Sequence, residues 1–321
     1  MGCCTSSMRT STGLQQIAAT ETSRARYTKL YRQLLRYCTL FTSQHSRPLY
    51  SRVASAQEDS VEGDGIVQAS AVPFVPAALI AMIPKHVFAQ ADEIQVYDAR
   101  IAPVGVFNLT VHDNYIENGS KTPSFPGGLV PEHLFNGVPE WAYGVTDWLE
   151  AGFYLPLYSE APANGALFNG LKLRALFVEP GAADDRFIYG INFEFSFNAK
   201  HWNRDRFTSE IRPIVGWHFG NVDLIFNPIL DNSYHGIGSL DFAPSTRLAY
   251  DFSSIWAIAA EEYDDFGPLR RFYEPSEQSH QFFAVVDYAG DLVDIEGGVG
   301  IGLMSATDNL TFKLILSCDL N

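Results

Sequence analysis

From about residue 100 onward, hydrophobic and polar residues alternate along the chain. The clearest example is residues 187–198, where every second position is aromatic or aliphatic and the intervening positions are Gly, Asn, Glu or Ser. Residues 149–157 and 293–303 repeat this pattern. A period of two indicates β-strands with two chemically different faces, and no helical period competes with it here.

The alternation predicts twelve strands: 103–116, 138–146, 148–158, 169–179, 186–198, 206–219, 222–231, 239–252, 255–263, 279–288, 292–303 and 310–320. Their connections are of two kinds. Short turns at 146–147, 220–221, 253–254 and 289–291 alternate with longer or intermediate loops. The longer connections include 117–137, 159–168, 199–205, 232–238 and 264–278. An even strand count, with short turns at one rim and long loops at the other, is typical of outer-membrane barrels. We therefore predict an all-β fold, a closed antiparallel transmembrane β-barrel of about 12 strands, with both termini at the short-turn, periplasmic rim.

Alternation alone does not decide which face points outward, because a soluble β-domain would bury the apolar face. Three features favour a membrane barrel over a soluble β-sandwich or binding domain. The polar face is rich in Gly and Ala, it carries charges of both signs in mid-strand, and Trp148, Trp217 and Trp256 flank short turns as an interfacial girdle does. We predict that the following charged residues line the lumen as a pore: Glu150, Lys172, Arg174, Glu194, Glu210, Arg212, Asp223, Asp241, Arg247, Glu261, Asp287, Asp294 and Glu296.

The first 91 residues have a different texture. Residues 1–70 are rich in Ser, Thr and Arg and predict a disordered or non-native extension; the alternative is lipidation at Gly2 and the two following cysteines. Residues 71–91 are apolar and end in an A-x-A sequence, which predicts a signal peptide cleaved after Ala91. An acidic stretch precedes it where a basic one is usual, so a buried strand or linker is the alternative. The barrel domain is then 92–321.

Composition excludes several classes of protein. No apolar run beyond the segment near residue 80 approaches twenty residues, so a helical membrane protein is excluded. The net charge of −15 disfavours nucleic acid as a partner. Neither metal-ligand spacing nor a nucleophile motif is present; His235 and Ser239 lie in a predicted loop with the wrong spacing. We therefore expect no enzyme activity, no metal and no cofactor, with a lipid-modifying enzyme as a distant third hypothesis.

Several short runs carry a resemblance to a known family. Residues 141–156 resemble the second hairpin of a proteobacterial outer-membrane barrel family, labelled as transporters or by association with a phenol meta-degradation pathway. Residues 192–196, 210–214, 227–228 and 256–263 are similar to further segments of it. The resemblance covers about residues 100–321 and implies a transporter of unspecified substrate. The chain ends Ser317-Cys-Asp-Leu-Asn321 rather than on the aromatic residue that the outer-membrane assembly machinery usually reads.

The leading functional hypothesis is a passive channel for small solutes in the Gram-negative outer membrane, with membrane lipid and the assembly machinery as partners. The excess of carboxylates on the polar face favours cations or neutral polar solutes, because charge rings set pore selectivity. The alternative is a non-conducting structural or partner-binding barrel whose arginines and carboxylates form a salt-bridged plug.

Overall fold

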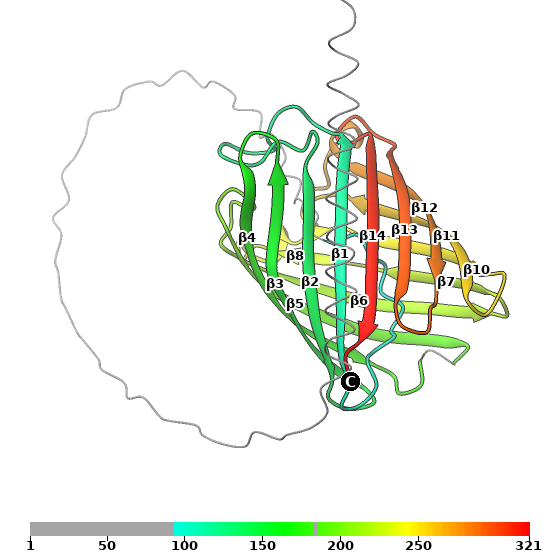
Figure 1. The fold of residues 1–321 in the computed structure, drawn as a ribbon. Helices are drawn as coiled ribbons and strands as arrows, with labels where there is room; N and C mark the ends of the chain where they lie inside the picture. Colours follow the sequence, from blue (N-terminus) through cyan, green and yellow to red (C-terminus); the bar gives the residue numbers. More distant parts are fainter. Residues whose placement is uncertain (1–92, 183–184) are drawn as a thin grey trace, which may run out of the picture.

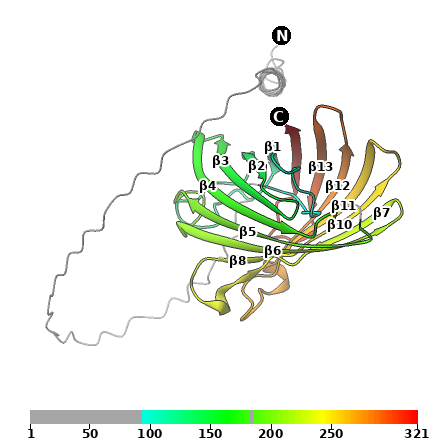
Figure 2. The same cartoon turned by 90° about the horizontal axis from the view of Figure 1, so that it is seen from below.

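The computed structural model describes residues 93–182 and 185–321, which form a closed antiparallel β-barrel (Figures 1 and 2). The predicted extension (1–70), the predicted signal peptide (71–91) and cleavage after Ala91 lie outside the described residues. Antiparallel pairing runs from strand to strand around the ring, and β1 (Phe107–Asn118) pairs with β14 (Leu310–Asp319) to close it, from Asn108 opposite Asp319 to Asn118 opposite Leu310.

The wall is built from the following strands: β1 (Phe107–Asn118), β2 (Phe135–Gly144), β3 (Leu149–Ala161), β4 (Gly165–Val178), β5 (Phe187–Asn198), β6 (Phe207–Phe219), β7 (Val222–Asn227), β8 (Leu230–Asn232), β9 (Asp241–Phe242), β10 (Ser245–Asp251), β11 (Trp256–Asp265), β12 (Ser279–Tyr288), β13 (Asp294–Gly302) and β14 (Leu310–Asp319). Two single-turn 3-10 helices, η1 (Ile237–Ser239) and η2 (Pro275–Glu277), lie in the connections. No helix among the described residues is long and apolar enough to cross a bilayer.

Two wall positions are interrupted. β7 and β8 are separated at Pro228, and β9 and β10 at Pro244, where a proline offers no N–H to the sheet. Counted as wall positions, β7 with β8 and β9 with β10 each form one strand. The barrel therefore has twelve antiparallel strands, and the predicted fold class is confirmed.

The β3–β4 connection differs from the prediction. We expected a long loop at 159–168, but both strands continue, and only residues 162–164 form a turn. The register of this pair shifts between Tyr154 and Tyr158, and Gly170 has a φ of 145°. Such irregularities break the period of two in the sequence, which is why the hairpin looked shorter than it is.

The apolar face of each strand points outward. Outward side chains such as Leu173, Phe193 and Ile258 are 53%, 40% and 50% exposed, whereas inward Asn192 and Glu194 are buried. Trp148, Trp217 and Trp256 are exposed and lie in or next to the short β2–β3, β6–β7 and β10–β11 turns. β1 begins and β14 ends at one rim of the barrel (Figure 1). A water-soluble barrel would place these apolar side chains inside, so the arrangement suits a barrel that faces lipid.

The chain before β1 corrects the prediction that strand 1 begins at residue 103. β1 begins at Phe107, after a turn in which Val106 N–H donates to the Pro103 carbonyl at 2.9 Å. Residues 93–104, called the lumenal segment below, enter the barrel instead of joining its wall, and Val96, Tyr97 and Ala99 are buried there. Its alternating apolar residues resemble a strand in sequence, but only one isolated bridge joins it to the wall.

Candidate functional site

The lumenal segment is held by side chains of the wall that bond to its backbone. The Asn227 amide forms a two-point contact with Tyr97: the Tyr97 N–H donates to Oδ1 at 2.8 Å, and Nδ2 donates to the Tyr97 carbonyl at 3.0 Å. Arg212 donates to the Gln95 carbonyl at 3.1 Å, and Lys313 Nζ donates to the Ile94 carbonyl at 3.2 Å. These bonds replace the sheet ladder that an extended segment would otherwise need.

Apolar contacts hold the same segment. Its residues Val96 and Ala99 pack against inward side chains of β4–β7, namely Leu176, Val178, Ile188, Ile214 and Ile225. Ile94 packs on the opposite side against Phe283 and Val285 of β12. At the short-turn rim, a Cβ at Gly144 would overlap the carbonyl oxygens of Ala102 and Pro103. Glycine at this position is what lets the segment pass so close to the wall.

A first group of charges surrounds Arg174 on β4. Its guanidinium pairs with Glu140 of β2 and with Glu150 of β3, the latter at 2.5 Å. His112 Nε2 lies 3.1 Å from Glu140, and the Ala102 N–H donates to Glu150 Oε2 at 2.5 Å. All four side chains are buried, so this group ties strands β1 to β4 to the lumenal segment.

A second group surrounds Arg247 and Lys313 on the opposite wall. Arg247 pairs with Glu261 and Asp287 and lies 3.5 Å from Glu296. Lys313 also pairs with Glu261 and lies 2.6 Å from Glu296. Carboxylates from three strands, β11, β12 and β13, therefore share two cations.

A third group lies at the level where the lumenal segment starts. Arg212 donates from Nε and from a terminal nitrogen to the two oxygens of Glu210, at 2.6 and 3.1 Å. Its other terminal nitrogen lies 3.4 Å from Glu93, and its guanidinium sits 4.4 Å from the ring centre of Tyr97. Nearby, Lys172 Nζ donates to Glu194 at 3.2 Å.

The structure places the remaining predicted lumenal residues near the rims. Asp223 lies 2.5 Å from His218 close to the short turns, and Asp294 accepts the Gly290 N–H at 3.1 Å. Asp241 lies toward the rim of long loops, where it lines a large cavity. Whether all these residues line a conducting pore stays a prediction.

Several lumenal residues are not among those predicted from the sequence. Glu140 and Lys313 lie within predicted strands, on the inward-facing alternate positions, so the alternation could have found them. His112 is in the same situation on β1. Glu93 and Tyr97 carried no such signal, because they precede the first strand and only the folded lumen gives them partners.

A polar cavity of about 1390 Å³, called the vestibule below, occupies the half of the lumen nearest the long loops. Its floor is formed by Glu93, Lys172, Glu194 and Arg212. Apart from Asp264, whose side chain points outward, ten Asp and Glu residues line it, against four Lys and Arg residues. Three of these carboxylates, Asp231, Asp241 and Asp265, come from β8, β9 and β11. Carboxyl groups therefore outnumber basic side chains in the vestibule.

Two long connections fold over the mouth of the vestibule. Leu129 and Leu134 of the β1–β2 connection pack with Trp202 of the β5–β6 connection, and all three are buried. Burial raises the pKa of the Asp308 carboxyl, whose Oδ1 accepts the Ser120 N–H at 3.1 Å. This carboxyl therefore keeps its proton to a higher pH than an ordinary aspartate, which lowers the negative charge beside the loop contact.

Together, the closed ring of twelve strands, the outward apolar face and the polar lumen define a transmembrane β-barrel.

No family model matches the chain, and no curated protein matches it. Solved structures of similar fold include an outer membrane channel from Pseudomonas putida F1, 15% identical with a TM-score of 0.48, covering 71% of this chain and 100% of that one. The translocator domain of the autotransporter NalP from Neisseria meningitidis is 11% identical, with a TM-score of 0.37 and coverages of 69% and 89%. A mutant of the monoaromatic hydrocarbon channel TodX is 9% identical, with a TM-score of 0.35 and coverages of 68% and 91%. Likeness at this level carries no argument about activity.

Proposed function

We propose that the protein is a channel for small polar solutes in the Gram-negative outer membrane, with the lumenal segment as its internal barrier. The observation that carries this proposal is the vestibule, a polar cavity of about 1390 Å³ that leads from the long-loop rim to the lumenal segment. A barrel with only a structural role gains nothing from such a cavity, because unfilled polar space contributes no packing. The barrier itself is a segment without strand pairing, which can move without opening the wall.

The second candidate is a non-conducting barrel. The three groups of buried ion pairs favour it, because each guanidinium is already matched by carboxylates and the lumen is crossed by the lumenal segment. The two candidates differ in whether the segment ever leaves its place. Conductance separates them directly.

The first prediction concerns the unmodified protein. Reconstituted in a planar lipid bilayer, it is expected to give discrete steps in current, with brief openings because the lumenal segment is docked most of the time. Boiled protein serves as the control. A preparation with native β-sheet circular dichroism that passes no current at any voltage would establish the non-conducting barrel instead.

The second prediction concerns selectivity. Because carboxylates outnumber basic residues in the vestibule, we expect the open channel to prefer potassium over chloride. Replacing Asp231, Asp241 and Asp265 by asparagine should move the potassium-to-chloride permeability ratio toward one. The measurement is the reversal potential in a potassium chloride gradient at alkaline pH. D291N, in a turn at the opposite rim, is the control; an equal shift there would contradict a filter in the vestibule.

A further inference from the structure

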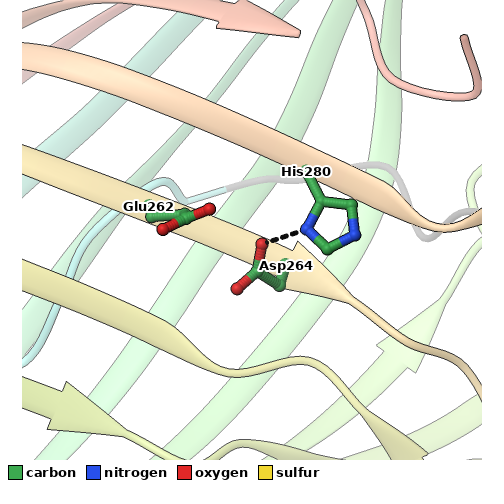
Figure 3. Close-up of side chains that lie close together, drawn as sticks. All are labelled: Glu262, Asp264 and His280. Carbon is green, nitrogen blue, oxygen red and sulfur yellow. Dashed lines mark hydrogen bonds and ion pairs between the residues drawn. The ribbon is translucent and has the colours of Figure 1, made fainter. Parts of the chain in front are cut away.

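A cluster of three metal-binding side chains lies on the outer face of the barrel, away from the lumen. Glu262 and Asp264 are two residues apart on β11, and His280 on β12 pairs with Asp264 across the sheet (Figure 3). Glu261, between the outward positions, points inward and is 1% exposed. Glu262, Asp264 and His280, called the outer cluster below, therefore share the outward face, at the long-loop end of the two strands.

The geometry of the outer cluster fits one metal ion. One donor atom of each residue, two carboxylate oxygens and one imidazole nitrogen, lies within 4.8 Å of the other two. Around an ion with bonds of about 2.0–2.2 Å to N and O ligands, neighbouring donor atoms are roughly 3–4 Å apart. Small side-chain rotations therefore bring all three donors onto one ion without moving the strands.

His280 is already oriented as a ligand would be. Its Nδ1 faces Asp264 Oδ1 at 2.6 Å, and its Nε2 lies 3.2 Å from Gln278 Oε1, outside the cluster. The Phe266 ring meets the imidazole edge-on at 5.3 Å between centres. A metal-bound imidazole usually donates its second N–H to an outer acceptor that fixes its tautomer, and Gln278 occupies that position.

The charges of the outer cluster are incompletely balanced. His280 pairs with Asp264, whereas the exposed Glu262 carboxylate has neither a hydrogen bond nor an ion pair with any described residue. Its outward neighbours Ile258 and Phe282 are exposed and apolar. A carboxylate at the edge of a lipid-facing surface is unfavourable, and a dication beside it reduces that cost.

We infer that Glu262, Asp264 and His280 form a binding site for a divalent transition-metal ion, represented by Zn²⁺. One imidazole and two carboxylates suit zinc better than magnesium or calcium, which prefer all-oxygen shells. The ion binds to deprotonated Nδ1 of the neutral imidazole, whose one proton is then on Nε2 and donates to Gln278; a second proton, where the ring carries one, leaves to solvent. Water fills the remaining positions, since Glu262 lies open to the exterior. The site joins β11 to β12 and does not depend on the proposed channel function.

The test is zinc titration of the full chain in detergent micelles by isothermal titration calorimetry. We expect E262Q to lose one zinc site relative to the unmodified protein, with unchanged circular dichroism because this side chain is exposed. Q278A should keep the site but bind zinc roughly 10-fold more weakly. Magnesium should not compete.

H235Q is the matched control, because His235 also pairs with an aspartate, Asp205, at 3.0 Å on an exposed surface but has no third ligand among residues 93–182 and 185–321. It should bind as many zinc ions as the unmodified protein. Equal stoichiometry and affinity in E262Q and the unmodified protein would overturn the proposal, as would loss of the same site in H235Q. In zinc-soaked crystals, anomalous scattering should place an ion between β11 and β12; a signal elsewhere only would also overturn it.

Discussion

Replacing Lys313 by methionine is expected to lower the free energy of unfolding of the barrel by about 3–5 kcal/mol, because it leaves three lumenal carboxylates to share a single cation, Arg247. Lys313 is 4% exposed and reaches Glu261, Glu296 and the Ile94 carbonyl from β14. Methionine fills a similar volume but satisfies none of these oxygens. The measurement is guanidinium-induced unfolding and refolding in lipid vesicles, extrapolated to zero denaturant.

Two further variants make this result interpretable. K121M removes a lysine that is 81% exposed and 3.8 Å from Glu132, so it should change stability by at most about 1 kcal/mol. The double variant K313M/E261Q also removes one of the three carboxylate charges, which leaves Arg247 with Asp287 and Glu296, and should recover much of the loss. If K313M were as stable as the unmodified protein, the second group of charges would not hold the barrel together.

The second large effect is expected from Asn227→Ala, which removes both bonds between the wall and the backbone of Tyr97. At about 1 kcal/mol for each buried hydrogen bond, their loss should raise the ratio of displaced to docked lumenal segment about 30-fold. In planar bilayers this should appear as a greater fraction of time in the open state. The wall is otherwise unchanged.

Asn136→Ala provides the matched control. Asn136 is also a buried inward asparagine, but its side chain bonds to Asn114 and Ser159 of the wall rather than to the lumenal segment. Its open fraction should equal that of the unmodified channel. If both variants gained the same open time, general loosening of the barrel would explain the effect, and the lumenal segment would lose its role as a barrier.

The period of two was sufficient to predict the strands and the direction in which their side chains point, because a membrane barrel gives each face a different solvent. Residues 187–198 show this most clearly, with Phe193 outside and Glu194 inside. The lumenal segment could not be recognised, since Ile94 and Val96 alternate like a strand and only the absence of sheet partners distinguishes them. The β3–β4 hairpin was mistaken for a loop because its register shifts interrupt the pattern.

The grouping of the charges also needed the structure. Arg174 meets Glu140 and Glu150 only because β2, β3 and β4 lie in one particular register, and a shift of two residues would exchange its partners. The outer cluster was likewise invisible, since His280 is sixteen residues from Asp264 in the chain and opposite it in the sheet. Candidate residues can be read from alternation, whereas the contacts between them depend on strand pairing.

The glycines of the inner wall limit how this protein can change. Gly298 leaves room for the stem of Lys313, Gly152 for that of Arg174, and Gly300 for the ring of Phe283. In each pair, the large side chain fills the volume that a side chain at the glycine opposite it on the neighbouring strand would occupy. An added Cβ would overlap the Phe283 ring at Gly300, whereas at Gly298 and Gly152 it would lie 3.0 and 3.1 Å from the flexible stems opposite. A larger residue can therefore be accepted at position 300 in descendants of this gene only together with a smaller one at position 283.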